Sequence, residues 1–199
     1  MNNRHLFNIV LLGAPGCGKG TQAALIQKEY GLTHISTGAM FRHEISARTP
    51  IGLEADKAIS RGNYCSDELT LDLLNQRITQ ASEARGFILD GVPRTIEQAL
   101  KMDGIHYQKP ITISLVICLK VDDAEIIKRV LQRAKIENRA DDTLEIVKQR
   151  ISNYYTLTEP LMTYYEMQHK LCIINGMQHT GKVFADIETA IQECDFSKE

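Results

Sequence analysis

The sequence predicts an α/β protein built on a parallel sheet with helices on both faces. Short, almost wholly apolar runs alternate along the 199 residues with longer amphipathic stretches of helical spacing. The apolar runs do not alternate polar with apolar residues, which is typical of strands that are covered on both sides. The chain is 43% hydrophobic and carries no repeat, low-complexity tract or linker rich in Pro, Gly or Ser. We therefore expect one domain with one main core.

The expected elements follow in order along the chain. Strands are expected at 6–12, 34–35, 87–89, 111–119 and 171–174, of which the second has the weakest pattern. Helices are expected at 18–30, 38–48, 66–84, 95–102, 122–134, 142–155 and 182–193. Ser66 suits the start of the third helix, because a serine hydroxyl caps free N–H groups and Asp67 follows in the first turn.

Composition and charge exclude several classes of function. A net charge of −2 gives no general attraction to nucleic acid or to a membrane surface. The five cysteines are scattered and form no C-x-x-C, so we expect reduced thiols, no structural zinc and a cytoplasmic chain. The apolar start is a weak match to a secretory signal because Asn8 interrupts it. No run approaches the ~20 apolar residues of a membrane span, so we expect a soluble protein.

The clearest motif lies where the first strand ends. Residues 13–22 read GAPGCGKGTQ, and G-x-x-x-x-G-K between a strand and a helix is the P-loop pattern. Glycines let backbone N–H groups turn around a phosphate, the helix N-terminus adds its positive dipole end, and Lys19 adds a full charge. An ordinary glycine-rich turn is the alternative, and it needs no lysine. Gly20 replaces the usual Ser/Thr after the lysine, with Thr21 next.

The longer motif G-x-P-G-x-G-K-G-T-Q resembles the phosphate loop of adenylate kinases and related nucleoside monophosphate kinases. The resemblance extends over nearly the whole chain. It includes 34–42 (HISTGAMFR), 62–69 (GNYCSDEL), 86–99 (GFILDGVPRTIEQA), 129–150 (RVLQRAKIENRADDTLEIVKQR) and 175–178 (NGMQ). It implies a P-loop NTPase fold with a five-stranded parallel sheet flanked by helices. It also implies a core of 1–35, 66–131 and 143–199, an acceptor-binding segment at 36–65 and a short lid at 132–142.

The resemblance also assigns site residues. ATP would contact Gly16, Cys17, Gly18, Lys19, Gly20, Thr21, Arg129, Arg133 and Gln178. AMP would contact Thr37, Arg42, Asn63, Tyr64, Cys65, Gly91, Val92, Pro93, Arg94, Gln98, Arg139 and Arg150. The catalytic charges would be Lys19, Arg94, Arg129, Arg133, Arg139 and Arg150. Asp90 ends an apolar strand and would hold Mg²⁺ through water, as the second acid of a P-loop enzyme does.

Ordinary alternatives exist at several of these positions. Arg129 and Arg133 share one helix face, and exposed arginines at this spacing are usually solvated. Asp141 and Asp142 could cap the next helix, and Tyr64 is expected mainly to pack around the pocket. Joint occurrence in the family's order behind a P-loop favours the functional interpretation. The chain departs from the family pattern at two positions: Ala39 stands for an acidic residue and Val92 for a phenylalanine.

The implied function is reversible transfer of the terminal phosphoryl group of ATP to AMP, giving two ADP, with Mg²⁺. Such a phosphotransferase would serve adenine nucleotide homeostasis and nucleotide biosynthesis, and we expect a monomer whose partners are ATP, AMP and ADP. One alternative is a UMP/CMP kinase, against which Thr37 and Gln98 favour AMP. Another is a P-loop switch protein that phosphorylates no second nucleotide. Against it, Arg42, Arg94, Arg139 and Arg150 exceed what a one-nucleotide site needs.

Overall fold

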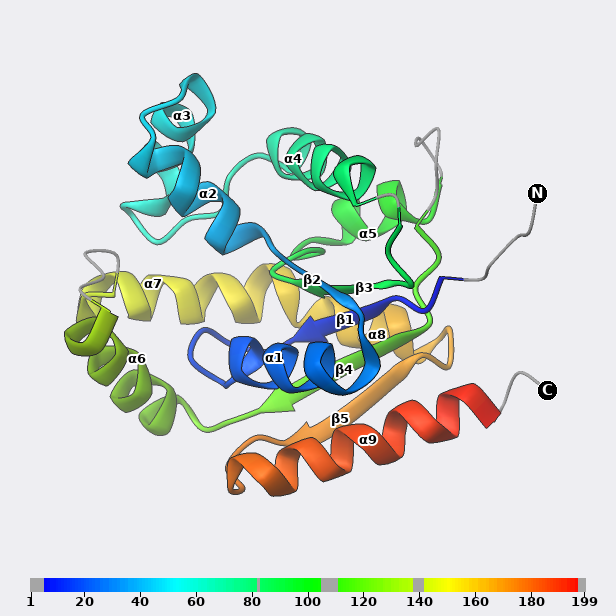
Figure 1. Cartoon of the computed structure of the whole chain (residues 1–199). Coiled ribbons are helices and arrows are strands. Elements are labelled where there is room, and N and C mark those ends of the chain that lie inside the picture. Colours follow the sequence, from blue (N-terminus) through cyan, green and yellow to red (C-terminus); the bar gives the residue numbers. More distant parts are fainter. Residues whose placement is uncertain (1–5, 82, 105–110, 138–141, 197–199) are drawn as a thin grey trace.

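The fold is a central parallel sheet between layers of helices (Figure 1). The computed structural model describes residues 6–81, 83–104, 111–137 and 142–196. The strands are β1 (Ile9–Leu12), β2 (Thr33–Ser36), β3 (Phe87–Asp90), β4 (Leu115–Lys120) and β5 (Leu171–Asn175). They lie in the order β2-β3-β1-β4-β5, and every neighbouring pair is parallel. The predicted α/β class with a five-stranded parallel sheet is confirmed.

Helices connect the strands. They are α1 (Lys19–Tyr30), α2 (Thr37–Ser46), α3 (Pro50–Ile59), α4 (Asp67–Gln80), α5 (Ile96–Met102), α6 (Asp123–Glu137), α7 (Leu144–Asn153), α8 (Pro160–Glu166) and α9 (Thr180–Phe196). A five-residue π-helical turn, η1 (Tyr154–Thr158), joins α7 to α8. The expected start of α4 is confirmed, because the Ser66 hydroxyl accepts a hydrogen bond from the Leu69 N–H at 3.2 Å.

Alternate residues of β1 belong to two different apolar layers, which explains its unbroken apolar sequence. Ile9 and Leu11 belong to the cluster that contains Ile26 of α1, together with residues of α9. Val10 and Leu12 belong to the cluster that contains Leu74 of α4, together with residues of α5 and α8. All four strand residues are at most 3% exposed. A strand buried on both faces has no polar side to show in its sequence.

Helix α3 was not expected, since the sequence predicted a helix at 38–48 and no further helix before residue 66. Pro50 is the first residue of this second helix, where its missing N–H costs nothing. The Thr49 hydroxyl caps the helix by accepting from the Gly52 N–H at 3.0 Å. Since α2 ends at Ser46, Pro50 does not interrupt it but begins the next helix.

The helical stretch after residue 153 is also longer than expected. Pro160 is the first residue of α8 and cannot donate a backbone hydrogen bond. Just before it, the Glu159 N–H donates to the Tyr154 carbonyl five residues back, at 2.8 Å. The chain therefore passes through a wider turn and continues as a helix instead of stopping. Two strands differ as well: β1 begins at Ile9 rather than at 6, and β4 at Leu115 rather than at 111.

The strand order places a crevice at the carboxyl ends of the strands. From β1 the chain first crosses to β2 and β3 on one side, and it later adds β4 and β5 on the other. At such a switch point the connections leave in opposite directions, so a crevice opens at the carboxyl ends of the strands. Within the described ranges, no helix has both the length and the apolar character that crossing a bilayer requires.

Candidate active site

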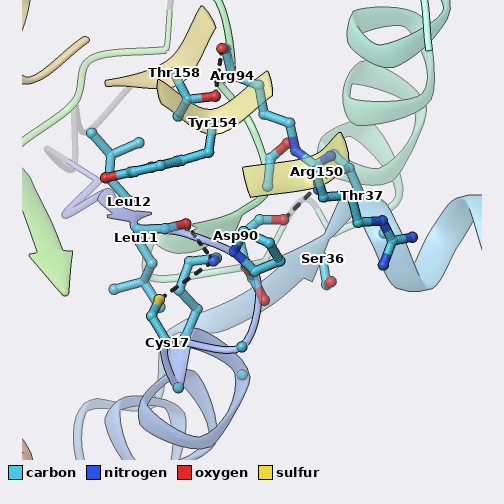
Figure 2. Close-up of a pocket in the computed structure, with 18 of the residues that line it drawn as sticks. Leu11, Leu12, Cys17, Ser36, Thr37, Asp90, Arg94, Arg150, Tyr154 and Thr158 are labelled. Carbon is cyan, nitrogen blue, oxygen red and sulfur yellow. Dashed lines mark hydrogen bonds between the residues drawn. The ribbon is translucent and has the colours of Figure 1, made fainter. Parts of the chain in front are cut away.

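A cleft of about 920 Å³ occupies this crevice (Figure 2). It is lined by segments that are far apart in the sequence, including the P-loop, the start of α2 and the loop after β3. The predicted site residues that line it are Gly16, Cys17, Gly18, Lys19, Gly20, Thr21, Thr37, Arg42, Asn63, Tyr64, Cys65, Asp90, Gly91, Pro93, Arg94, Gln98, Arg129, Arg133, Arg150 and Gln178. Arg139 lies outside the described residues. The Val92 side chain is fully buried in the core and does not line the cleft.

The P-loop needs its glycines for both conformation and space. Gly13 and Gly16 have φ angles of 138° and 82°, which side chains rarely adopt. A Cβ at Gly13 would lie 2.7 Å from the Leu119 carbonyl oxygen, and one at Gly16 would lie 2.5 Å from a Val130 methyl carbon. The loop therefore folds tightly against β4 and α6, and α1 begins directly after it at Lys19.

Lys19 turns back over the loop that carries it. Its ammonium group donates hydrogen bonds to the carbonyl oxygens of Gly13 at 2.7 Å and Ala14 at 3.0 Å. The buried Cys17 thiol lies 3.6 Å from the same nitrogen. The charge is thus held at the mouth of the loop, at the N-terminus of α1, where an anion is also favoured by the helix dipole.

On the opposite side of the cleft, Thr37 ties the start of α2 to the end of β3. Thr37 is 2% exposed, and its hydroxyl donates to the Gly91 carbonyl oxygen at 2.9 Å. A Cβ at Gly91 would lie 2.7 Å from the Thr37 Oγ1 atom, so this close approach requires glycine. The same hydroxyl lies 3.5 Å from the Asp90 carbonyl oxygen, and Figure 2 shows Thr37 close to Asp90.

Asp90 carries a stable negative charge in the cleft. Burial by itself would raise the pKa of its carboxyl group, but His34, Lys19 and Arg94 outweigh that effect and hold the pKa below its usual value. The His34 Nε2 atom lies 3.5 Å from the carboxylate, which is long for a hydrogen bond, and the contact is an ion pair only when the imidazole is protonated. An ionised carboxylate beside the P-loop suits a divalent cation.

A chain of hydrogen bonds orients Gln98. The Arg94 N–H donates to the Gln98 Oε1 atom at 2.7 Å, and the Gln98 Nε2 atom donates to the Asp67 carboxylate at 2.7 Å. Asp67 also accepts from the Thr95 hydroxyl at 3.0 Å. Since Gln98 is 1% exposed, these two partners fix the orientation of its amide, with Oε1 towards Arg94 and Nε2 towards Asp67. One lone pair on Oε1 and one proton on Nε2 remain for a ligand.

Asp142 joins two of the predicted arginines. Its side chain is fully buried and contacts Arg133 through two nitrogens, at 2.9 Å to Nε and 2.8 Å to Nη2. The same carboxylate accepts from the Arg150 Nη1 atom at 2.9 Å. Thr143, rather than Asp142, caps α7 with its side chain. The carboxylate therefore aligns two guanidinium groups that line the cleft.

Arg129 and Gln178, which also line the cleft, have fixed neighbours as well. Arg129 contacts Glu125 at 2.8 Å and donates to the Gly176 carbonyl oxygen at 3.2 Å. Gln178 donates to the Asp186 carboxylate at 2.8 Å. The bond from Arg129 attaches the turn after β5 to α6, and the bond from Gln178 attaches the same turn to α9. In the loop between α3 and α4, burial raises the pKa of the half-buried Cys65 thiol to about 11, so the thiol is neutral near pH 7.

Several residues of the site were not predicted to have these roles. Asp67 was expected only in a helix turn, Asp142 had capping as its alternative, and His34 and Thr158 were not singled out. Each contacts a predicted site residue from a different segment. For Asp142, the sequence offered one signal: an acidic pair at 141–142 lies between two segments that carry arginines and could have suggested ion pairs with them. Among the described residues, no group of His, Cys, Asp and Glu side chains has the arrangement of a direct metal site.

Comparison with known proteins agrees with the fold and the motifs. The sequence model of the adenylate kinase family matches residues 11–170. The chain is 42% identical over 186 residues to an adenylate kinase of Parabacteroides distasonis, covering 94% of this chain and 98% of the relative. It is 39% identical to one of Maricaulis maris over 94% of this chain and 99% of the relative, and 40% identical to one of Stenotrophomonas maltophilia over 92% and 98%. The chain therefore belongs to the adenylate kinase family, phosphotransferases that interconvert ATP and AMP with two ADP.

Proposed function

We propose that the cleft binds ATP and AMP together and that the residues above divide between them. The P-loop, Arg129, Arg133 and Gln178 face the donor, whereas Thr37, Arg42, Gln98 and the segments 63–65 and 91–94 face the acceptor. Arg139 and Arg150 would bridge the two phosphate chains. The observation that carries this division is that Lys19, Arg94, Arg133 and Arg150 line one cleft from four different segments. One nucleotide would not need so many separate cations.

The transfer itself is a matter of position and charge. An oxygen of the AMP phosphate, already largely ionised at neutral pH, attacks the terminal phosphorus of ATP while the bond to the bridging oxygen of ADP breaks. Negative charge spreads over the moving group and the leaving oxygen. Lys19 and the arginines neutralise that charge, and guanidinium groups do so in a bidentate manner. No side-chain base is needed.

Asp90 is the residue that suits a magnesium site. Its carboxylate is ionised, lies at the carboxyl end of β3 and feels the charge of Lys19. Bound Mg²⁺ would neutralise the outer phosphates of ATP and help to align them. Asp90 would hold such an ion through water molecules.

The moving parts would follow the units expected from the sequence. We assign the core to 1–35, 66–131 and 143–199, the acceptor-binding segment to 36–65 and the lid to 132–142. Closure of the two mobile segments would exclude water, which otherwise competes as the phosphoryl acceptor. We further propose a monomeric cytoplasmic enzyme of adenine nucleotide balance. Its five free cysteines fit a reducing compartment.

A coupled assay of ADP formation from ATP with AMP, CMP or UMP tests this function. We expect kcat/KM for AMP to exceed that for each pyrimidine by at least about tenfold, because a purine pocket leaves its polar partners unsatisfied by the smaller base. Comparable efficiency with CMP or UMP would indicate a pyrimidine nucleotide kinase. Failure to phosphorylate any acceptor would indicate a nucleotide-binding switch.

Two variants refine the assignment of the acceptor pocket. Gln98→Ala should narrow the preference for AMP by lowering kcat/KM for AMP, since the amide that Asp67 and Arg94 orient is lost. Thr37→Ala should narrow the preference mainly by raising kcat/KM for CMP and UMP. Exposed Gln76 on α4 offers a matched control, because Gln76→Ala removes an amide outside the cleft. Equal losses for all three acceptors in Gln98→Ala would contradict a role in reading the base.

A further inference from the structure

We propose that Tyr64 is a positioning residue that holds Arg94 in place for the acceptor phosphate. Tyr64 lies in the loop between α3 and α4, whereas Arg94 follows β3. The inference rests on the proposed function, in which Arg94 binds the phosphate of AMP. Although Tyr64 belongs to the segment 63–65 that faces the acceptor, its main role is assigned to Arg94, on which it acts through both its ring and its hydroxyl group.

The ring of Tyr64 lies against the charged end of Arg94. The Arg94 Cζ atom is 4.7 Å from the ring centroid. A cation within about 6 Å of an aromatic centroid is attracted by the negative face of the ring. The guanidinium group also remains free to offer its N–H groups in its own plane, which is the plane that binds a phosphate. The contact therefore restrains Arg94 without using the donors that the ligand needs.

The hydroxyl group of Tyr64 reaches the backbone of Arg94 through Thr158. The Thr158 Oγ1 atom donates to the Arg94 carbonyl oxygen at 2.9 Å, a bond drawn in Figure 2. A threonine hydroxyl has one proton, which this bond uses. In the 3.0 Å contact between Tyr64 and Thr158, the tyrosine must therefore be the donor. The relay runs from Tyr64 to Thr158 and on to Arg94, and bonds in such a chain strengthen one another.

These contacts complete a set of restraints on Arg94. Its N–H is bonded to Gln98, its carbonyl to Thr158, and its guanidinium group lies over Tyr64. An arginine side chain loses much rotamer freedom when it is fixed, and restraint before binding removes that cost from the ligand. Thr158 is 5% exposed and belongs to η1, so the wide turn before Pro160 is what brings its hydroxyl to Arg94. An aliphatic residue at position 64 would supply neither the relay nor the cation–π contact.

The test compares steady-state kinetics of Tyr64→Leu, Tyr64→Phe, Thr158→Val and Arg94→Gln with the unchanged chain. Tyr64→Leu should lower kcat/KM for AMP about tenfold, within the two- to thirtyfold range of a cation–π contact, and leave KM for ATP within about twofold. Tyr64→Phe keeps the ring and should lower kcat/KM for AMP about threefold to tenfold, the effect of one hydrogen bond. Thr158→Val removes both bonds of the relay and should lower kcat/KM for AMP at least as much, and the double variant Tyr64→Phe/Thr158→Val should behave like Thr158→Val.

The matched control is Tyr164→Phe, which removes a tyrosine hydroxyl that bonds Asp103 outside the cleft. It should leave kcat/KM for AMP unchanged. The decisive comparison is between the double variant Tyr64→Leu/Arg94→Gln and Arg94→Gln alone. If Tyr64 acts through Arg94, kcat/KM for AMP should be the same in both, because there is no arginine left to position. A further tenfold loss in the double variant would overturn the proposal, because it would show that Tyr64 acts on the pocket independently of Arg94. A matching loss of ATP binding would overturn it too.

The outcome also separates this proposal from the proposed function. If Arg94→Gln alone leaves kcat/KM for AMP unchanged, the assignment of Arg94 to the acceptor phosphate is wrong. If Arg94→Gln lowers it and the Tyr64 variants do not, the proposed function stands and the role of Tyr64 is overturned. Should Tyr64→Leu fail to fold, Tyr64→Phe and Thr158→Val still decide the relay, because both substitutions keep nearly the same volume.

Discussion

At the scale of residues, two carboxylates orient groups that face the cleft. Asp67 accepts from Gln98, and Asp142 accepts from Arg133 and Arg150. Neither carboxylate belongs to the cleft lining. Groups that must meet charge in a transition state act best when they are fixed beforehand. The specificity and the charge of this site therefore depend on residues that no nucleotide would touch.

Asp142→Asn should weaken both stability and turnover. The carboxamide cannot accept from two guanidinium groups as the carboxylate does, and hydrogen bonds to charged groups contribute about 1.5–3 kcal/mol each. Misalignment of Arg133 and Arg150 should lower kcat about tenfold to hundredfold. Thermal unfolding and steady-state assays measure the two effects. Asp72→Asn, an exposed change on α4, is the control, and equal behaviour of the two variants would contradict this role.

Lys19→Met should lower kcat by about 10²–10³-fold while the melting temperature stays nearly constant. The hydrogen bonds that Lys19 makes within the described chain are to its own loop, with the Cys17 thiol nearby, so little packing is lost with the ammonium group. Its charge, in contrast, lies where the phosphoryl group would move. Lys28→Met removes an exposed lysine from the same helix and should change neither quantity. Near-normal turnover in Lys19→Met would exclude this P-loop role.

At the scale of elements, the proposed acceptor-binding segment contains a close-packed pair of helices, α2 and α3, that rests on a small cluster shared with α4. Phe41 of α2, Ala55 of α3 and Leu73 of α4 form that cluster, which is distinct from the two clusters that cover the sheet. Gly52 lets α3 approach α2 closely, because a Cβ there would lie 2.0 Å from the Glu44 carbonyl oxygen. A helix pair on a separate small cluster can move relative to the sheet without opening the main core.

Gly52→Ala should therefore separate α2 from α3. Overpacking of this kind typically costs about 1–3 kcal/mol, and the loss should appear as a higher KM for AMP with KM for ATP unchanged. Gly181→Ala in α9 is the matched control, since the nearest atom there is 3.8 Å from the added Cβ. An alanine in that helix should be neutral or stabilising by up to about 1 kcal/mol. A Gly52→Ala variant with normal AMP kinetics would show that the close approach is dispensable.

At the scale of the whole molecule, a third cluster supports the base of the lid. It contains Ala14 after β1, Val130 of α6 and Ile151 of α7, and it is distinct from the clusters on the sheet. The proposed lid at 132–142 and the proposed acceptor-binding segment at 36–65 would thus move on separate clusters. Each should close when its own nucleotide supplies the phosphate partners.

A bisubstrate mimic that links both nucleotides should protect 36–65 and the described part of 132–142 from hydrogen exchange more than either nucleotide alone. The reason is that Arg42 and Arg133 would each gain a phosphate partner only when their own segment closes. Exchange measured peptide by peptide, with the strands of the sheet as the internal reference, checks this expectation. Equal protection of 36–65 by ATP alone would argue against two separately closing segments.

Removal of transition metals should leave the protein intact. The scattered cysteines and the short lid predict no structural zinc. After treatment with a zinc-selective chelator and restoration of Mg²⁺, both activity and melting temperature should be unchanged. Stoichiometric zinc in the purified protein, or unfolding on chelation, would contradict this prediction.

Much of the architecture could be predicted because it depends on local patterns. The apolar runs at 87–89 and 171–174, the glycines of 13–18 and the cap at Ser66 act within a few residues, so sequence alone reveals them. Boundaries were less predictable where one residue has two opposite effects. Pro50 and Pro160 suggest the end of a helical stretch, but each is the first residue of a helix. A pattern that treats proline as a breaker therefore misses α3 and α8.

The sequence by itself determined the sheet, the P-loop and the family, and nearly all of the site residues that it predicted line the cleft. Only the tertiary structure decided how those residues are held and which of them lie elsewhere. It buried Val92 in the core, gave Asp142 two arginines, and linked Tyr64 to Arg94 through Thr158. Thr158 and Arg94 are 64 residues apart, and periodicity reports only on near neighbours. Such contacts exist because the strand order and the turn at η1 bring distant segments together, and no short motif records that meeting.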